Sequence, residues 1–201
     1  MSLLTKLTNN VRNCFNASRN VSEELPKGDK EIILSTYKVL LEADPELFSK
    51  AWIMSASRST SIRKSFNLIE SNNIHIEVEF TKFSAVIERF FTRIICDEKL
   101  ATELFERSCI NLGKRHVDFV SFGFHSNYWD IFLNCMLDVI ADTVVVAFVD
   151  DVKQQHQVQK SWNKFVGRIV FLMQSGFKQR QLAEKTVDKK NNSNEINENN
   201  F

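Results

Sequence analysis

Apolar residues recur at three- and four-residue intervals through most of the chain, the spacing of one face of an α-helix. The first such run starts at Glu31 and stops near Asp44-Pro45. Proline suits the first turn of a new helix and aspartate suits its N-cap, so the pattern predicts a second helix from Pro45 onward. The inward positions of the first run are Ile33, Tyr37, Leu40 and Leu41.

The second helix weakens over residues 55–61, where small polar residues accumulate. A short helical turn from Ser61 to Phe66 and a loop at 67–74 are expected next. A strongly apolar helix then ends near Asp97, and its wide stripe is typical of a helix buried between two layers. Its apolar residues are Phe80, Phe83, Ile87, Phe90, Phe91, Ile94 and Ile95.

Three more helices are expected, over about 99–116, from Ser126 or Asn127 onward, and over about 155–180. The run 143–149 has β propensity. A lone strand would have no partner in a helical chain, so we interpret this run as the end of a helix followed by a corner. The pattern thus predicts an all-α protein of about seven helices joined by short connections.

Composition supports this interpretation and excludes several functions. The 201 residues include 17 Phe but only five Gly and two Pro, and a chain so poor in turn residues favours long helices. A net charge of +1 without a basic stripe argues against nucleic-acid binding. Four cysteines without C-x-x-C pairing indicate reduced thiols in a cytoplasmic protein. No run approaches ~20 apolar residues, so we expect no transmembrane segment.

The ends of the chain differ from its middle. Residues 1–27 are mixed and close with the Pro26-Lys27-Gly28 break, so they are interpreted as a flexible N-terminal extension. Residues 183–201 are rich in Asn and charge, a composition that cannot offset the entropy of ordering, and are predicted to be a disordered tail. The expected domain spans residues 28–182.

His116 is the strongest candidate for chemistry. It ends a helical stretch, shares a face with Phe105, Cys109 and Leu112, and precedes an aromatic-rich corner over 117–125. A neutral imidazole can bind a metal through one nitrogen, and the Leu112 carbonyl one turn earlier could fix the other. The plainer alternative is a helix-terminal histidine favoured by the helix dipole.

Four features, taken in sequence order, indicate a resemblance to a known family. They are the first-helix segment Leu34–Val39 with Tyr37 at an aromatic position, Phe66 after the Ser61 turn, His116 in Leu112–Val117, and the segment Lys160–Phe165. Together they resemble the globin family, most of all the divergent globins of nematodes and the neuronal-type globins. The resemblance implies a globin fold of seven to eight helices around a haem pocket, haem b as cofactor, and His116 as the axial iron ligand.

The family's usual spacings, counted forward from Phe66 and backward from His116, both arrive at Ile87 as the residue facing the sixth iron position. Ile87 replaces the distal His or Gln common in the family. The same counting places Trp52 and Phe91 in the distal wall, and Trp52 would carry the only nearby donor there. The predicted haem-binding residues are His116, Phe66, Trp52, Ile87, Phe91, Leu112 and Phe122, with Lys114 and Arg115 as candidates for a haem propionate.

A crowded, donor-poor distal pocket would favour fast release of oxygen and autoxidation. We therefore expect a globin that binds O2, NO or CO, or cycles its iron, in redox or gas signalling rather than bulk oxygen storage; a homodimer is compatible with this picture. The alternative is a globin fold that has lost haem and serves as an interaction or sensor module. No hydrolase or phosphate-loop motif is present, so we expect no enzyme beyond haem-dependent side activity such as peroxide turnover or nitrite reduction.

Overall fold

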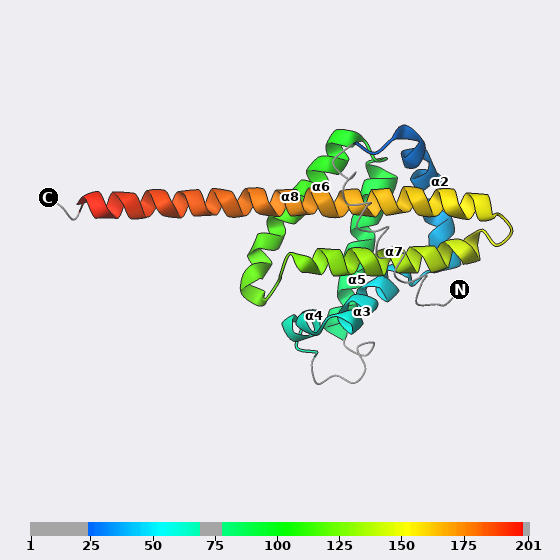
Figure 1. Ribbon diagram of the computed structural model, residues 1–201, viewed down its shortest axis with the longest axis horizontal. Coiled ribbons are helices and arrows are strands. Elements are labelled where there is room, and N and C mark those ends of the chain that lie inside the picture. The colour runs from blue at the N-terminus through cyan, green and yellow to red at the C-terminus, as the bar shows by residue number, and fades with distance from the viewer. Residues whose placement is uncertain (1–23, 69–77, 199–201) are drawn as a thin grey trace, which may run out of the picture.

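A computed structural model describes residues 24–68 and 78–198, and within these ranges every regular element is helical. The predicted all-α class is therefore confirmed. Figure 1 shows the helices crossing one another around a shared core. In chain order they are α2 (Lys27–Ala43), α3 (Leu47–Arg58), α4 (Thr60–Ser65), α5 (Val78–Thr92), the π-helix η3 (Arg93–Asp97), α6 (Thr102–Arg115), the 3-10 helix η4 (His116–Phe122), α7 (Asn127–Ala147) and α8 (Val152–Glu198).

The first helix, α2, packs its predicted apolar face against α8. The rings of Tyr37 and Trp162 stack with centroids 6.2 Å apart, and the Trp162 indole nitrogen donates to Thr36 Oγ1 at 3.0 Å. The Tyr37 hydroxyl shares a 2.7 Å hydrogen bond with Thr92 at the end of α5. Burial raises the pKa of Tyr37 to about 12, although the bond with Thr92 opposes the rise. These contacts join the first helix to both later layers.

The corner between α2 and α3 differs slightly from the expected one. Asp44 Oδ1 accepts from the Glu46 backbone nitrogen at 3.1 Å and from Lys50 Nζ at 2.7 Å. Helix α3 begins only at Leu47, because Pro45 and Glu46 form a turn before it. Asp44 therefore binds the residue that precedes α3 and a lysine in its first turn. Part of the loop expected at 67–74 lies outside the described residues.

The helical segment that contains α5 ends near Asp97 as expected, because the π-helix η3 follows directly after Thr92. Phe91, Ile94 and Ile95 are buried in the main core. Phe83 and Val86 on the same helix stay 44% and 51% exposed. The apolar stripe of α5 is thus wider than the core that covers it.

Two glycines allow α6 and α8 to cross at unusually close range. A Cβ on Gly113 would lie 2.0 Å from the Met173 carbonyl oxygen, and one on Gly176 would lie 2.1 Å from the Ile110 carbonyl oxygen. Both distances are far below van der Waals contact, so the crossing depends on the missing side chains. The helix that carries the predicted ligand at its end is in this way set directly on α8.

The C-terminal part of the chain departs from expectation at one point. Residues 143–147 form the end of α7, as the interpretation of this β-prone run required. Helix α8, however, continues to Glu198, through most of the segment predicted to be a disordered tail, and extends beyond the other helices (Figure 1). Once the packed part of α8 has formed the helix nucleus, each added residue costs little, and Lys, Gln, Glu and Ala propagate a helix well. None of the helices in 24–68 and 78–198 has the length and apolar character needed to cross a membrane.

Candidate functional site

His116 stands at the junction between α6 and η4, where its backbone keeps a helical conformation (φ −66°, ψ −14°). Its ring Nδ1 pairs with the Leu112 carbonyl oxygen at 2.8 Å, as predicted for a histidine that offers its other nitrogen. Burial lowers the pKa of His116, and the bond to Leu112 opposes the change. The structure thus favours a neutral imidazole with Nδ1 carrying the proton, which is the state of a metal-ligating histidine.

Aromatic rings surround this imidazole. Phe124 and Trp129 lie with centroids 5.1 Å from it, and Phe119 lies 5.6 Å away. Sequence reasoning placed Phe122 here, but that side chain is 75% exposed. Gly123, in the left-handed region at φ 89°, turns the chain between Phe122 and Phe124, so Phe124 faces His116 instead. Trp129 lies on α7, and its buried indole nitrogen has no hydrogen-bond partner among the described residues.

A polar network fixes the corner that follows η4. Ser65 Oγ donates to the Gly123 carbonyl oxygen at 2.9 Å, and the Tyr128 hydroxyl donates to the same oxygen at 3.1 Å. The two hydroxyls also lie 2.9 Å apart. A side chain on Gly123 would meet Ser65 Oγ at 2.9 Å as well as being strained by its backbone angle. The segment before Phe66 is therefore tied to the segment after His116.

Trp52 and Phe66, two predicted pocket residues far apart in the sequence, lie together in the structure. Their rings meet edge to face at 5.6 Å between centroids, and Trp52 stacks on Phe80 at 4.8 Å. The Trp52 indole nitrogen donates to the Phe80 carbonyl oxygen at 2.8 Å. The sequence does not determine the direction of this indole N–H. In the structure it points to the backbone of α5.

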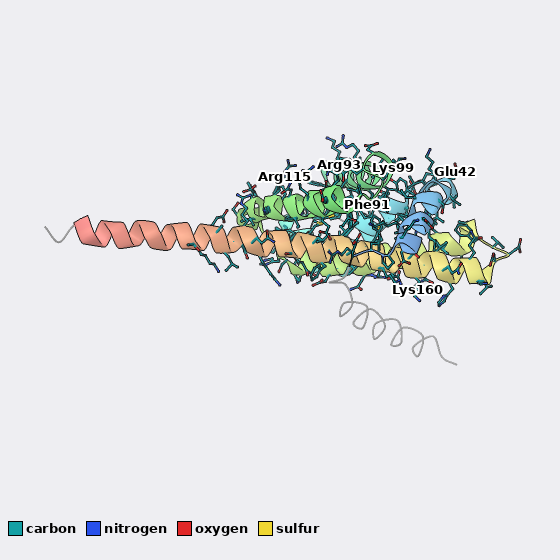
Figure 2. The ribbon with its side chains drawn as sticks, turned by 90° about the horizontal axis from the view of Figure 1, so that it is seen from above. Glu42, Phe91, Arg93, Lys99, Arg115 and Lys160 are labelled. Atoms are coloured by element: carbon teal, nitrogen blue, oxygen red, sulfur yellow. The ribbon has the colours of Figure 1, made fainter. Side chains whose placement is uncertain are left out.

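Phe91 and Ile87 occupy the same helix at different depths. Phe91 is buried between Phe48 and Phe165, with centroids 4.9 Å and 5.9 Å away, whereas Ile87 is half-buried at the edge of the main core. Figure 2 shows Phe91 within the helical body and Arg115 at its outer edge. Arg115 is exposed and Lys114 half-buried, and neither side chain has an ion-pair partner in the described ranges.

The donor set suits a cofactor that brings most of its own ligands. Residues 24–68 and 78–198 contain no cluster of three or more side chains able to hold a bare metal ion. A single neutral histidine among aromatic rings fits haem, in which the porphyrin supplies four nitrogens and the protein one axial ligand. A cavity of about 480 Å³ lies elsewhere, between α2, α3 and α7, and includes Met54 and Val146 but none of the predicted site residues.

An all-helical fold that ends one helix in a half-buried, aromatic-lined histidine defines a candidate haem-binding protein of the globin type. The comparison with family models reaches the same class, because the Globin model matches residues 49–173, more than half of the chain. The chain belongs to the globin family, whose members typically bind haem and diatomic ligands. The match includes Trp52, Phe66, Ile87, Phe91 and His116. No curated protein and no solved structure matches the chain.

Proposed function

We propose that this globin binds haem b with His116 as its axial ligand, and that it works with O2, NO or CO in redox or gas signalling rather than in bulk oxygen storage. The observation that carries the proposal is the state of His116. Its Nδ1 is engaged by Leu112 and its pKa is lowered by burial, so Nε2 is available to iron at neutral pH. Haem, when bound, would supply an iron that can bind a diatomic ligand and change its oxidation state by one electron.

The distal residues support the second half of the proposal. Ile87 offers no hydrogen-bond donor, and the Trp52 indole already donates to Phe80. Turning the indole toward a ligand would break a bond worth about 0.5–1.5 kcal/mol net. A diatomic ligand opposite His116 would therefore meet apolar side chains from Ile87 and Phe91. Without a donor, oxygen leaves quickly, a property that serves redox cycling or gas sensing better than storage.

Haem binding is tested by reconstituting the full chain and recording its absorption spectrum with and without a reductant, CO and oxygen. We expect a Soret band in the wild type and its loss or strong decrease in His116→Ala. His156→Ala is the matched control, because His156 is exposed on α8. A wild type without a Soret band would overturn the proposal in favour of a haem-free globin-fold module.

The signalling role is tested separately by stopped-flow measurement of oxygen release and by the rate of autoxidation. We expect fast release and fast oxidation in the wild type. Trp52→Phe should change neither rate by more than about twofold, because the indole nitrogen is already occupied. Slow oxygen release that becomes fast in Trp52→Phe would show that the indole serves the ligand, and would contradict the redox role.

A further inference from the structure

We infer that Arg180 is a positioning residue for His116, clamping the junction of α6 and η4 and tying it to the projecting end of α8. The inference deepens the proposed function, on which the role of His116 as ligand rests. Arg180 was not singled out by its sequence context. It lies three residues beyond Phe177, where α8 leaves the buried core.

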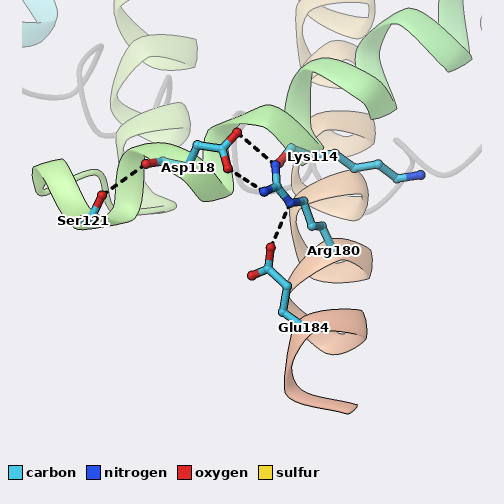
Figure 3. A network of polar contacts seen from close by, with 5 residues as sticks. All are labelled: Lys114, Asp118, Ser121, Arg180 and Glu184. Atoms are coloured by element: carbon cyan, nitrogen blue, oxygen red, sulfur yellow. Dashed lines mark hydrogen bonds and ion pairs between the residues drawn. The ribbon is translucent and has the colours of Figure 1, made fainter. Parts of the chain in front are cut away.

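The guanidinium of Arg180 contacts Lys114 and Asp118 at once (Figure 3), and His116 lies between these two residues in the sequence. Its Nη1 donates to the Lys114 carbonyl oxygen at 3.1 Å, two residues before the histidine. Its Nη1 and Nη2 also bind the two Asp118 carboxylate oxygens, at 3.0 and 2.5 Å, two residues after the histidine. Its Nε donates to Glu184 at 2.9 Å, one turn further along α8. The guanidinium carries five N–H donors on three nitrogens, and each of these nitrogens makes at least one of the hydrogen bonds just described.

The position of these contacts matters because the backbone changes its helical type at His116. The backbone N–H of His116 is directed at the carbonyls of Leu112, Gly113 and Lys114 in the last turn of α6. The Leu112 carbonyl also pairs with the His116 ring, and the Lys114 carbonyl also accepts from Arg180. Asp118 belongs to the first turn of η4. A rigid fork that holds the last turn of α6 and the first turn of η4 together restricts how the intervening residue can tilt.

Stability alone does not account for this arrangement. Arg180 and Asp118 are 34% and 56% exposed, and ion pairs this exposed contribute little to folding. The close α6–α8 crossing at Gly113 already holds the two helices together. What the clamp adds is geometry at the histidine.

The same contacts connect the histidine to the part of α8 that projects from the domain. Leu182 is 65% exposed, so few packing contacts hold the helix beyond Arg180. A movement of His116 that shifts Asp118 relative to Lys114 would weaken the grip on Arg180 and loosen the next turn of α8. By thermodynamic linkage, loosening that turn of α8 would in return change the orientation of His116.

The test compares Arg180→Ala, Arg180→Lys and Asp118→Asn with two controls in the full chain. Glu184→Gln changes the same turn of α8 but leaves the contacts with Lys114 and Asp118 in place. Lys164→Ala removes a comparable ion pair, with Asp29, on the opposite side of the domain from Arg180 along α8. Backbone hydrogen exchange of residues 116–122 and 181–186 is measured in haem-free protein. The iron–histidine stretching frequency and the midpoint potential are measured after haem loading.

We expect Arg180→Ala and Asp118→Asn to speed exchange in both segments by roughly twofold to tenfold, the factor for losing one ordinary hydrogen bond. They should also shift the iron–histidine frequency, with Arg180→Lys intermediate and both controls unchanged. Unaltered exchange and frequency in Arg180→Ala, or equal changes in Glu184→Gln, would overturn the inference. If the wild type takes up no haem, the proposed function fails, but exchange in the haem-free chain still decides whether the clamp exists.

Discussion

The two sides of the predicted haem pocket are held in place by different forces. On the proximal side, directional bonds position His116: the Leu112 carbonyl orients its ring, and Arg180 binds the backbone and side chain on either side of it. On the distal side, aromatic packing dominates, with Trp52 against Phe66 and Phe80, and Phe91 against Phe48. The Trp52 indole N–H, the donor predicted for this side, donates to the Phe80 carbonyl oxygen.

This difference separates what is rigid from what is selective. Hydrogen bonds define an angle, so they suit the side that must present one nitrogen in one direction. Apolar contacts define a shape and exclude water, but they do not favour one diatomic ligand by hydrogen bonding. The chain therefore specifies where iron would be held more strictly than what would bind to it. Four measurements can break or sharpen this contrast.

The largest effect is expected from Phe91→Ala on the distal side. Phe91 is 2% exposed and packs against the rings of Phe48, Phe90 and Phe165, so its truncation should lower the free energy of unfolding by about 3–5 kcal/mol. Phe122→Ala is the control, because a 75% exposed ring should matter by no more than about 0.5 kcal/mol. Urea unfolding of the haem-free variants measures both. Equal losses would mean that Phe122 shares the burial assigned to Phe91.

On the proximal side, Gly113→Ala should destabilise by about 1–3 kcal/mol, because its Cβ would collide with the Met173 carbonyl and force α6 away from α8. Gly28→Ala has open space around the new methyl group, so the free energy of unfolding should stay the same or rise slightly. Denaturant curves with far-UV circular dichroism compare the two. A neutral Gly113→Ala would refute the close crossing as the support of the histidine helix.

A donor introduced opposite His116 should have a moderate effect. Ile87→Gln would add a hydrogen bond worth about 0.5–1.5 kcal/mol to oxygen, slowing its release roughly twofold to tenfold. Ile87→Leu keeps the position apolar and should leave the release rate near that of the wild type. Stopped-flow oxygen release of the reconstituted variants is the measurement. An unchanged rate in Ile87→Gln would show that residue 87 does not face the ligand.

The smallest effect concerns pH. Burial holds the pKa of folded His116 below its ordinary value of 6.5, so the unfolded chain takes up this proton at a higher pH than the folded one. The contribution of His116 to stability is thus complete above about pH 6.5 and is lost as the pH falls through the lowered value. The free energy of unfolding should fall more between pH 7.5 and pH 5.5 in the haem-free wild type than in His116→Gln. The same difference in both proteins would assign the acid sensitivity to other groups.

Helices with a sustained helical spacing of apolar residues were predicted better than the points where those helices end. The helix containing Phe91 and the run at 143–149 have the expected structure, because burial of an apolar face imposes the same period on any helix. The tail after residue 182 differs, because its composition is polar and the continuation of a helix depends on the packed segment before it.

The same limit applies to the site. His116 and its Leu112 partner could be read from a spacing of four residues, since both belong to one helix. The choice between Phe122 and Phe124 could not, because it depends on the left-handed turn at Gly123 and its contact with Ser65. Trp129 and Arg180 were missed near His116, as their proximity arises from helices far along the chain.

By itself, the sequence determined the helical class, the histidine that ends α6 and the apolar character of residues 52, 87 and 91, because these follow from local periodicity and side-chain chemistry. The tertiary structure decided where the Trp52 indole donates, which Phe faces His116, and which cation grips the residues beside it. Those outcomes depend on hydrogen-bond geometry between segments 28 to 66 residues apart. A hydrogen bond requires both partners to be placed in three dimensions, and only the folded chain places them.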